Sequence, residues 1–192
     1  MTVRIQCRCG TVQAVIEPAG LLGRATCYCR DCQAWAHWLG TPGLLDARGG
    51  TDILAAMPAR MHITAGMEQL ACATLSGRVL RWYAACCRSP LGATARSAKA
   101  QYVGIPVSTA VSPAEVEAHV GAEGRAVAHA GSATAHVRST PLGIARVGAR
   151  VGLALVGARL RGERRSPFFD PASGRPVRVP ERITAPHPEM QP

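Results

Sequence analysis

The pattern of hydrophobic and polar positions changes about halfway along the chain. Over residues 3–107, short segments in which apolar and polar residues alternate are separated by Gly and Pro, a pattern typical of β-strands joined by turns. The segments on either side of Gly10 predict a hairpin with Val12 and Ile16 on one face. We therefore predict that residues 1–108 form a mainly β domain of antiparallel strands.

Residues 109–165 have a helical pattern instead, and we interpret them as a helical insertion. Ser112 is placed to cap a helix that begins at Pro113, and Glu115 completes a capping box. Residues 141–165 predict a second helix, with Ile144, Val147, Val151 and Leu155 on one side and Arg146, Arg150, Arg161 and Arg164 on the other.

The arginine-edged helix has two interpretations. We favour a helix that lays its apolar side on the domain and leaves its arginines in solvent. Contact between residues 141–165 and an anionic membrane surface or an acidic partner is the alternative, which we do not favour. The remaining segment, 166–192, contains both Phe residues and a DPASG turn, and we expect it to pack back on the β domain before a frayed end.

Composition supports one domain with a small helical appendage. The chain has 192 residues, of which 47% are hydrophobic and 18% charged, as in soluble globular proteins. The N-terminal residues lack the apolar core of a signal peptide, and no later run reaches the roughly 18 uncharged apolar residues of a membrane span. We therefore expect a cytoplasmic protein, in which clustered cysteines are metal ligands or catalytic groups rather than disulfide partners.

The net charge of +10 comes from 21 Arg and one Lys, distributed over both halves of the chain. A basic surface attracts phosphate or carboxylate groups. The near absence of Lys, however, indicates a coding preference for Arg as much as selection for nucleic acid, so we do not favour nucleic-acid binding as the main function.

The eight cysteines carry the strongest chemical signal. Cys27, Cys29 and Cys32 form a Cys-x-Cys-x-x-Cys segment that can surround one zinc ion and leave its fourth position open, as in catalytic zinc sites. Unligated buried thiols, or a redox pair of Cys29 and Cys32, are the alternatives. Cys7 and Cys9 are weaker candidates, because in a strand two such side chains merely share a face.

The order of these cysteine groups is also familiar. The runs CRCG, CYCRDCQ and HITAGMEQLACATLSGRVLRWYAACCRSPLG resemble the glutathione-dependent formaldehyde-activating enzyme and centromere protein V family, also called GFA-like or Mss4-like domains, over about residues 3–108. The resemblance implies an Mss4-like β-tent with two zinc sites and carbon–sulfur lyase activity on thiol adducts of the glutathione type. It implies a closed structural site containing Cys7, Cys9 and Cys87, and a second zinc on Cys27, Cys29 and Cys32 where the adduct is processed.

The chain departs from the family pattern at one ligand. Ala84 stands where the family has a cysteine, and Cys86 is the substitute that we expect. Adjacent side chains in an extended backbone point to opposite faces, so Cys86 and Cys87 can bind one ion only if the chain turns sharply between them. Otherwise water or another residue completes this site, or it holds no metal.

The resulting hypothesis is that zinc on the cysteine triplet acts as a Lewis acid in making or breaking a carbon–sulfur bond. Arg30 and Arg24 are candidates to hold the carboxylates of a glutathione-like substrate, although both could equally be solvated surface charges. His37 is a weaker candidate for the open zinc position or for proton transfer. The alternative function is a non-catalytic, zinc-stabilised binding module whose basic helix contacts an anionic partner.

Overall fold

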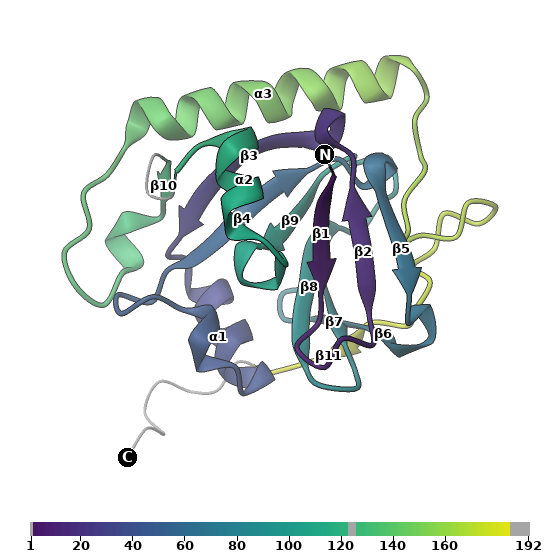
Figure 1. Cartoon of the computed structure of the whole chain (residues 1–192), viewed down its shortest axis with the longest axis horizontal. Coiled ribbons are helices and arrows are strands. Elements are labelled where there is room, and N and C mark those ends of the chain that lie inside the picture. The colour runs from purple at the N-terminus through teal and green to yellow at the C-terminus, as the bar shows by residue number, and fades with distance from the viewer. Residues whose placement is uncertain (1, 123–125, 185–192) are drawn as a thin grey trace.

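The computed structural model describes residues 2–122 and 126–184, and this part of the chain has a mainly β fold with two sheets and three α-helices (Figure 1). The prediction of a mainly β protein with a small helical part is confirmed. The smaller sheet has the order β1-β2-β5 and the larger has the order β10-β3-β4-β9-β8-β7-β6-β11. The strands are β1 Val3–Gln6, β2 Gln13–Ile16, β3 Leu21–Cys27, β4 Thr51–Ala56, β5 Met61–Ala65, β6 Leu70–Thr74, β7 Val79–Ala84, β8 Ser89–Ala95, β9 Val103–Pro106, β10 Val127–Ala128 and β11 Glu181–Arg182.

The helices lie outside the two sheets. Short 3-10 turns join several of the strands, and each of the three α-helices follows a different segment of the β fold. The α-helices are α1 Arg30–Leu39, α2 Pro113–Val120 and α3 Pro141–Leu160, and the 3-10 turns are Pro18–Gly20, Pro42–Leu44, Pro58–Arg60, Met67–Gln69, Val107–Thr109 and Ala130–Ser132.

Most strand pairs are antiparallel, as the alternating pattern predicts. The predicted hairpin pairs Val3 with Ile16 across β1 and β2, and Gly10 occupies the left-handed region with φ +82° at its turn. Two short pairs are parallel, β10 with β3 and β11 with β6. Both bring distant segments of the chain to an edge of the larger sheet, where each covers backbone groups that would otherwise be unpaired.

The main core fills the space between the two sheets. In β7, Leu80, Trp82 and Ala84 are fully buried in this core, so the alternate residues of the strand face the other side of the larger sheet. Trp82 donates a hydrogen bond from Nε1 to Thr94 Oγ1 at 2.9 Å, which satisfies its polar atom. Cys72 also lies in this core, where burial raises the pKa of its thiol to about 12.

The C-terminal segment packs on the same core. Phe168 and Phe169 are buried, and the rings of Trp82 and Phe168 have centroids 4.9 Å apart. Further along, Ile183 is buried beside α1. The frayed end that the sequence predicts falls on residues 185–192, which lie outside the described residues.

Helix α1 lies within the cysteine-rich stretch, where the sequence analysis predicted no helix. It begins after Cys29 and ends at Gly40, which adopts φ +66°, the left-handed conformation common after a helix. Trp35, Ala36 and Leu39 pack on the face of the larger sheet that is opposite the main core. The sequence analysis interpreted the cysteine spacing as that of metal ligands and did not predict the amphipathic helix that begins there.

Helices α2 and α3 follow the predicted pattern with small changes. Ser112 caps α2 by accepting a hydrogen bond from the backbone N–H of Glu115 at 3.4 Å. Helix α3 ends at Leu160 rather than 165, and lies along β3 at the top of the molecule in Figure 1. Val147 of α3 sits over Gly23, where an added Cβ would lie 3.1 Å from the valine methyl groups.

Candidate metal centres

The first cysteine group lies where β3 ends and α1 begins. Cys27 is the last residue of β3, Cys29 is the N-cap of α1, and Cys32 lies in its first turn. The three Sγ atoms lie within 4.8 Å of one another, so the group could hold a metal ion. The amino end of a helix carries partial positive charge that favours thiolates, which adds to the effect of proximity.

Hydrogen bonding concentrates negative charge on one sulfur of this group. Hydrogen bonds with Cys27 and Cys32 lower the pKa of the Cys29 thiol to about 2. A hydrogen bond with Cys29 raises the pKa of the Cys27 thiol, and hydrogen bonds with Cys27 and then Cys29 raise the pKa of the Cys32 thiol. A thiolate at Cys29 with two further sulfurs within 4.8 Å is a favourable site for a cation.

The second group contains Cys7 and Cys9, from the turn between β1 and β2, and Cys86 and Cys87, from the turn between β7 and β8. The four Sγ atoms all lie within 4.8 Å of one another, and we call this group the four-cysteine cluster. The Sγ distances are 3.5 Å for Cys7–Cys9, 3.3 Å for Cys9–Cys86 and 3.9 Å for Cys86–Cys87. Sulfurs about 2.3 Å from a tetrahedral ion lie about 3.8 Å apart, so this spacing suits such an ion.

The sharp turn that the adjacent cysteines require is present. The backbone N–H of Arg88 donates to the carbonyl of Ala84 at 2.8 Å, and Arg88 adopts φ +55°, which is uncommon for a residue other than glycine. Cys86 and Cys87 can therefore face one centre. Ala84 is fully buried in the main core, whereas Cys86 is exposed in the turn, so the turn rather than the strand brings a fourth sulfur to this group.

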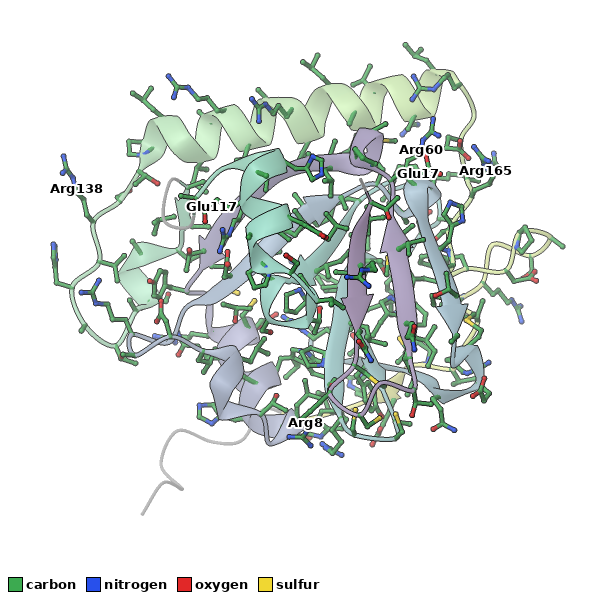
Figure 2. All side chains as sticks on the ribbon, viewed as in Figure 1. Arg8, Glu17, Arg60, Glu117, Arg138 and Arg165 are labelled. Carbon is green, nitrogen blue, oxygen red and sulfur yellow. The ribbon has the colours of Figure 1, made fainter. Side chains whose placement is uncertain are left out.

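Hydrogen bonds from neighbouring residues help to position the cluster. Ser89 Oγ accepts a hydrogen bond from the backbone N–H of Arg8 at 2.9 Å and lies 3.1 Å from Cys87 Sγ. The N–H of Val12 donates to Cys7 Sγ at 3.2 Å, and Arg8 donates to the carbonyl of Cys87 at 3.2 Å. Figure 2 shows Arg8 at the lower end of the strands. The sequence analysis did not identify Ser89, because its partner is distant in sequence.

The two cysteine groups are connected through α1. Arg88, in the turn that carries Cys86 and Cys87, donates to the carbonyls of Trp38 and Leu39 at the carboxyl end of α1. Its guanidinium carbon lies 4.3 Å from the centroid of the Trp38 ring. Since Cys29 and Cys32 stand at the other end of the same helix, the turn of the four-cysteine cluster helps to position the cysteine triplet.

A cavity of about 380 Å³ adjoins the cysteine triplet, over the face of the larger sheet that α1 covers. Its lining includes two of the three sulfur residues and is otherwise mainly apolar. The lining residues are Cys29, Asp31, Cys32, Trp35, Leu44, Thr51, Ile53, Val79, Arg81, Pro90, Gly92, Ala93, Gly104, Pro106 and His129.

Arg81 is a residue of this cavity that the sequence analysis missed. It is only 6% exposed, and its guanidinium carbon lies 5.8 Å from the Trp35 ring centroid. Across the described residues, no carboxylate oxygen lies within 4.0 Å of its nitrogen atoms. In the sequence, Arg81 stands between Leu80 and Trp82, so it faces the other side of the strand. The structure adds that α1 covers that side.

Thr51 contributes a buried hydroxyl to the same cavity. It pairs with Cys27 across β3 and β4, and within the described part of the chain its Oγ1 has no hydrogen-bond partner. A buried hydroxyl without a partner is costly unless a bound group completes it. This atom is therefore able to donate a hydrogen bond to a group in the cavity.

The predicted substrate-binding arginines lie elsewhere. Arg24 is buried and binds the carboxylate of Asp52 through Nε and Nη2, at distances of 2.5–3.0 Å. Arg30 and His37 are exposed on α1. Among the described residues that line the cavity, none of Arg24, Arg30 and His37 occurs. A role for Arg24 and Arg30 in binding substrate stays a prediction.

Comparison with known proteins identifies a family without a described activity. The sequence model of a family of unknown function, DUF6151, matches residues 1–177. A crystal structure of a Rhodobacter sphaeroides protein matches with a TM-score of 0.42 and 18% sequence identity, over 59% of this chain and 94% of that chain. No match is found among curated proteins. The chemistry of the site therefore rests on its own residues.

Proposed function

The chain belongs to DUF6151, a family of unknown function, and from its own residues we propose that it is a zinc-binding protein that processes thiol adducts. Zinc occupies a closed site on Cys7, Cys9, Cys86 and Cys87 and an open site on Cys27, Cys29 and Cys32. The observation that carries the proposal is the convergence of three sulfurs within 4.8 Å beside a cavity of about 380 Å³.

The donor atoms suit zinc. Thiolates are ligands that zinc prefers, and a set of four is typical of a structural site, whereas three protein ligands are typical of a catalytic one. The short Sγ distances in the four-cysteine cluster support the first site. The unpartnered hydroxyl of Thr51 beside the second supports a site that receives another molecule.

The reaction class that we propose is carbon–sulfur bond making or breaking, with the Mss4-like β-tent as the fold, and the resemblance to GFA-like domains supports both. When bound at the triplet, zinc supplies Lewis acidity that lowers the pKa of a thiol or hydroxyl. The protein holds the sulfurs at the amino end of α1, and Trp35 and Ile53 add apolar surface to the lining of the cavity. The Thr51 hydroxyl can donate to the reacting group.

Zinc analysis of purified protein tests this proposal. We expect two zinc ions per chain in the wild type and one in Cys29→Ala, with the circular dichroism spectrum retained and turnover of an S-hydroxymethyl thiol adduct lost. Cys72→Ala is the matched control, because Cys72 lies in the main core, and it should keep two zinc ions. A wild-type zinc count in Cys29→Ala, or no zinc in the wild type, would overturn the proposal.

Helix α3 supports a second candidate function, which is docking on an anionic membrane surface. Leu142, Leu153, Val156 and Leu160 are between 58% and 83% exposed. At about 100° per residue they lie within about 60° of one another, opposite the side that packs on β3. Helix α3 is therefore apolar on two sides, whereas the sequence analysis predicted one apolar side.

The charges of α3 favour an anionic lipid surface as the occupant of its outer side. Arg146 and Arg150 border the exposed leucines, and residues 141–160 contain no acidic side chain. A second copy would bring the same arginines together without a countercharge, and a nucleic acid would not contact leucines favourably. By length and composition α3 could cross a membrane, but its inner side packs on β3, so we propose that it lies in the interface.

Vesicle sedimentation tests this second candidate. We expect the chain to bind vesicles of phosphatidylserine and phosphatidylcholine but not pure phosphatidylcholine, and the double variant Leu153→Gln/Leu160→Gln to bind at least about tenfold more weakly. Val179→Gln is the control, because Val179 is also an exposed apolar residue but does not belong to α3. Unchanged binding of the double variant would refute membrane docking, and so would dimerisation of the wild type that the double variant abolishes.

A further inference from the structure

The cavity beside the cysteine triplet contains one buried cation in a mainly apolar lining. We propose that it selects a small thiol with a single carboxylate and an apolar body, whose carboxylate binds Arg81 while its sulfur reaches the triplet. This inference rests on the proposed function, because it assigns the substrate class of the same site.

The guanidinium of Arg81 is available for an anion. A buried charge is costly unless it is paired. In the described chain its neighbours are the Trp35 ring and the cysteine triplet, and no carboxylate lies within ion-pair distance. The planar fork of arginine donors matches a carboxylate with two parallel hydrogen bonds, so the side chain is suited to this ligand.

The strand register provides space for that carboxylate. Arg81 pairs with Ala93 on β8, so its neighbour on that side has the shortest side chain that carries a Cβ, whereas Ala73, its partner on β6, is packed in a cluster with Trp35 and Leu39 of α1. Cross-strand neighbours on one face lie about 5 Å apart, and larger ones would fill the volume beside the guanidinium. Ala93 itself lines the cavity.

The polarity of the cavity argues against glutathione. Glutathione carries two carboxylates and an ammonium group, each of which needs a partner when buried. Besides Arg81, the charged residues of the lining are the exposed Asp31 and His129, together with the cysteines. Arg24 already binds Asp52. Trp35, Leu44, Ile53 and Val79 offer apolar contact instead, and about 380 Å³ lies near the lower end of ligand-site volumes.

Calorimetric titration of the zinc-loaded full chain tests the inference. The probes are 3-mercaptopropionate, the uncharged 3-mercapto-1-propanol, and glutathione. We expect the wild type to bind 3-mercaptopropionate about 10- to 100-fold more tightly than the uncharged thiol, and more tightly than glutathione. In Arg81→Gln the two thiols should bind with about equal affinity, and the affinity for the uncharged thiol should be the same as in the wild type. Arg78→Gln, which removes an exposed arginine of the preceding turn, should behave as the wild type.

Several results would overturn the inference. One is an unchanged preference for 3-mercaptopropionate in Arg81→Gln. Another is equal weakening of both small thiols in that variant, which would mean that Arg81 only balances the charge of the triplet. The third is tighter binding of glutathione than of 3-mercaptopropionate by the wild type. If Arg81→Gln does not fold, Arg81→Met removes the charge and keeps an apolar stem, and a wild-type preference in that variant would be equally decisive against it.

Zinc counts on the same samples separate this inference from the proposed function. Wild-type zinc content and thiol binding in Cys29→Ala would refute both. Loss of zinc and thiol binding in Cys29→Ala, with no effect of Arg81→Gln on the preference, would refute only the role of Arg81.

Discussion

Replacing Cys86 by alanine measures the contribution of one ligand to the four-cysteine cluster. Cys86 is exposed, so its removal leaves no cavity and should change the stability of the metal-free protein by no more than about 0.5 kcal/mol. Structural zinc binding amounts to about 10–16 kcal/mol for a full ligand set, and an equal quarter of it is about 2.5–4 kcal/mol. The variant should therefore bind zinc at this site about 100- to 1,000-fold more weakly.

Competition with a chelator of known zinc affinity is the assay, with thermal unfolding in the presence and absence of zinc as a second readout. Because Ala84 is fully buried in the main core, adding Ala84→Cys to Cys86→Ala should not restore affinity, although it creates a Cys-x-x-Cys spacing with Cys87. Unchanged zinc affinity in Cys86→Ala, or rescue by Ala84→Cys, would show that the turn at Cys86 does not supply the ligand.

Three further predictions concern stability. Asp52→Asn removes the carboxylate that Arg24 binds through Nε and Nη2 and should lower the free energy of unfolding by about 3 kcal/mol in urea titrations. Arg24→Met should partly restore this loss in the double variant. Hydrogen bonds with His62 and then Arg60 lower the pKa of Glu17 in the folded protein. The stability that Glu17 contributes is therefore present above about pH 4.3, its unfolded pKa, and is lost as the pH falls through its lower folded pKa. Glu17→Gln should make the free energy of unfolding less dependent on pH over that range, and an equal pH dependence in both proteins would contradict this. Removing metal with a chelator should lower the Tm, and readdition of zinc should restore it, whereas an unchanged Tm would exclude a stabilising metal.

The sheet elements were predictable because their signals are local. Alternation predicted the strands, and the left-handed Gly10 marks the hairpin that the sequence places there. Ser112 and Glu115 likewise predicted the start of α2. Helix α1 was missed because it is only 10 residues long and its first turn contains a cysteine that was interpreted as a metal ligand. The outer apolar side of α3 was missed because, in a helix with apolar residues on two opposite sides, the hydrophobic pattern does not point to either side alone.

The sequence by itself determined the local part of the chemistry: Cys27, Cys29 and Cys32 span six residues, so one strand end and one helical turn bring their sulfurs together. Only the tertiary structure decided that Cys9 and Cys86, 77 residues apart, lie 3.3 Å from each other, and that Arg81 is buried beside the triplet. Contacts of that range depend on which strands pair and which sheet face a helix covers. Those choices are settled by packing of the whole chain rather than by any short run of residues.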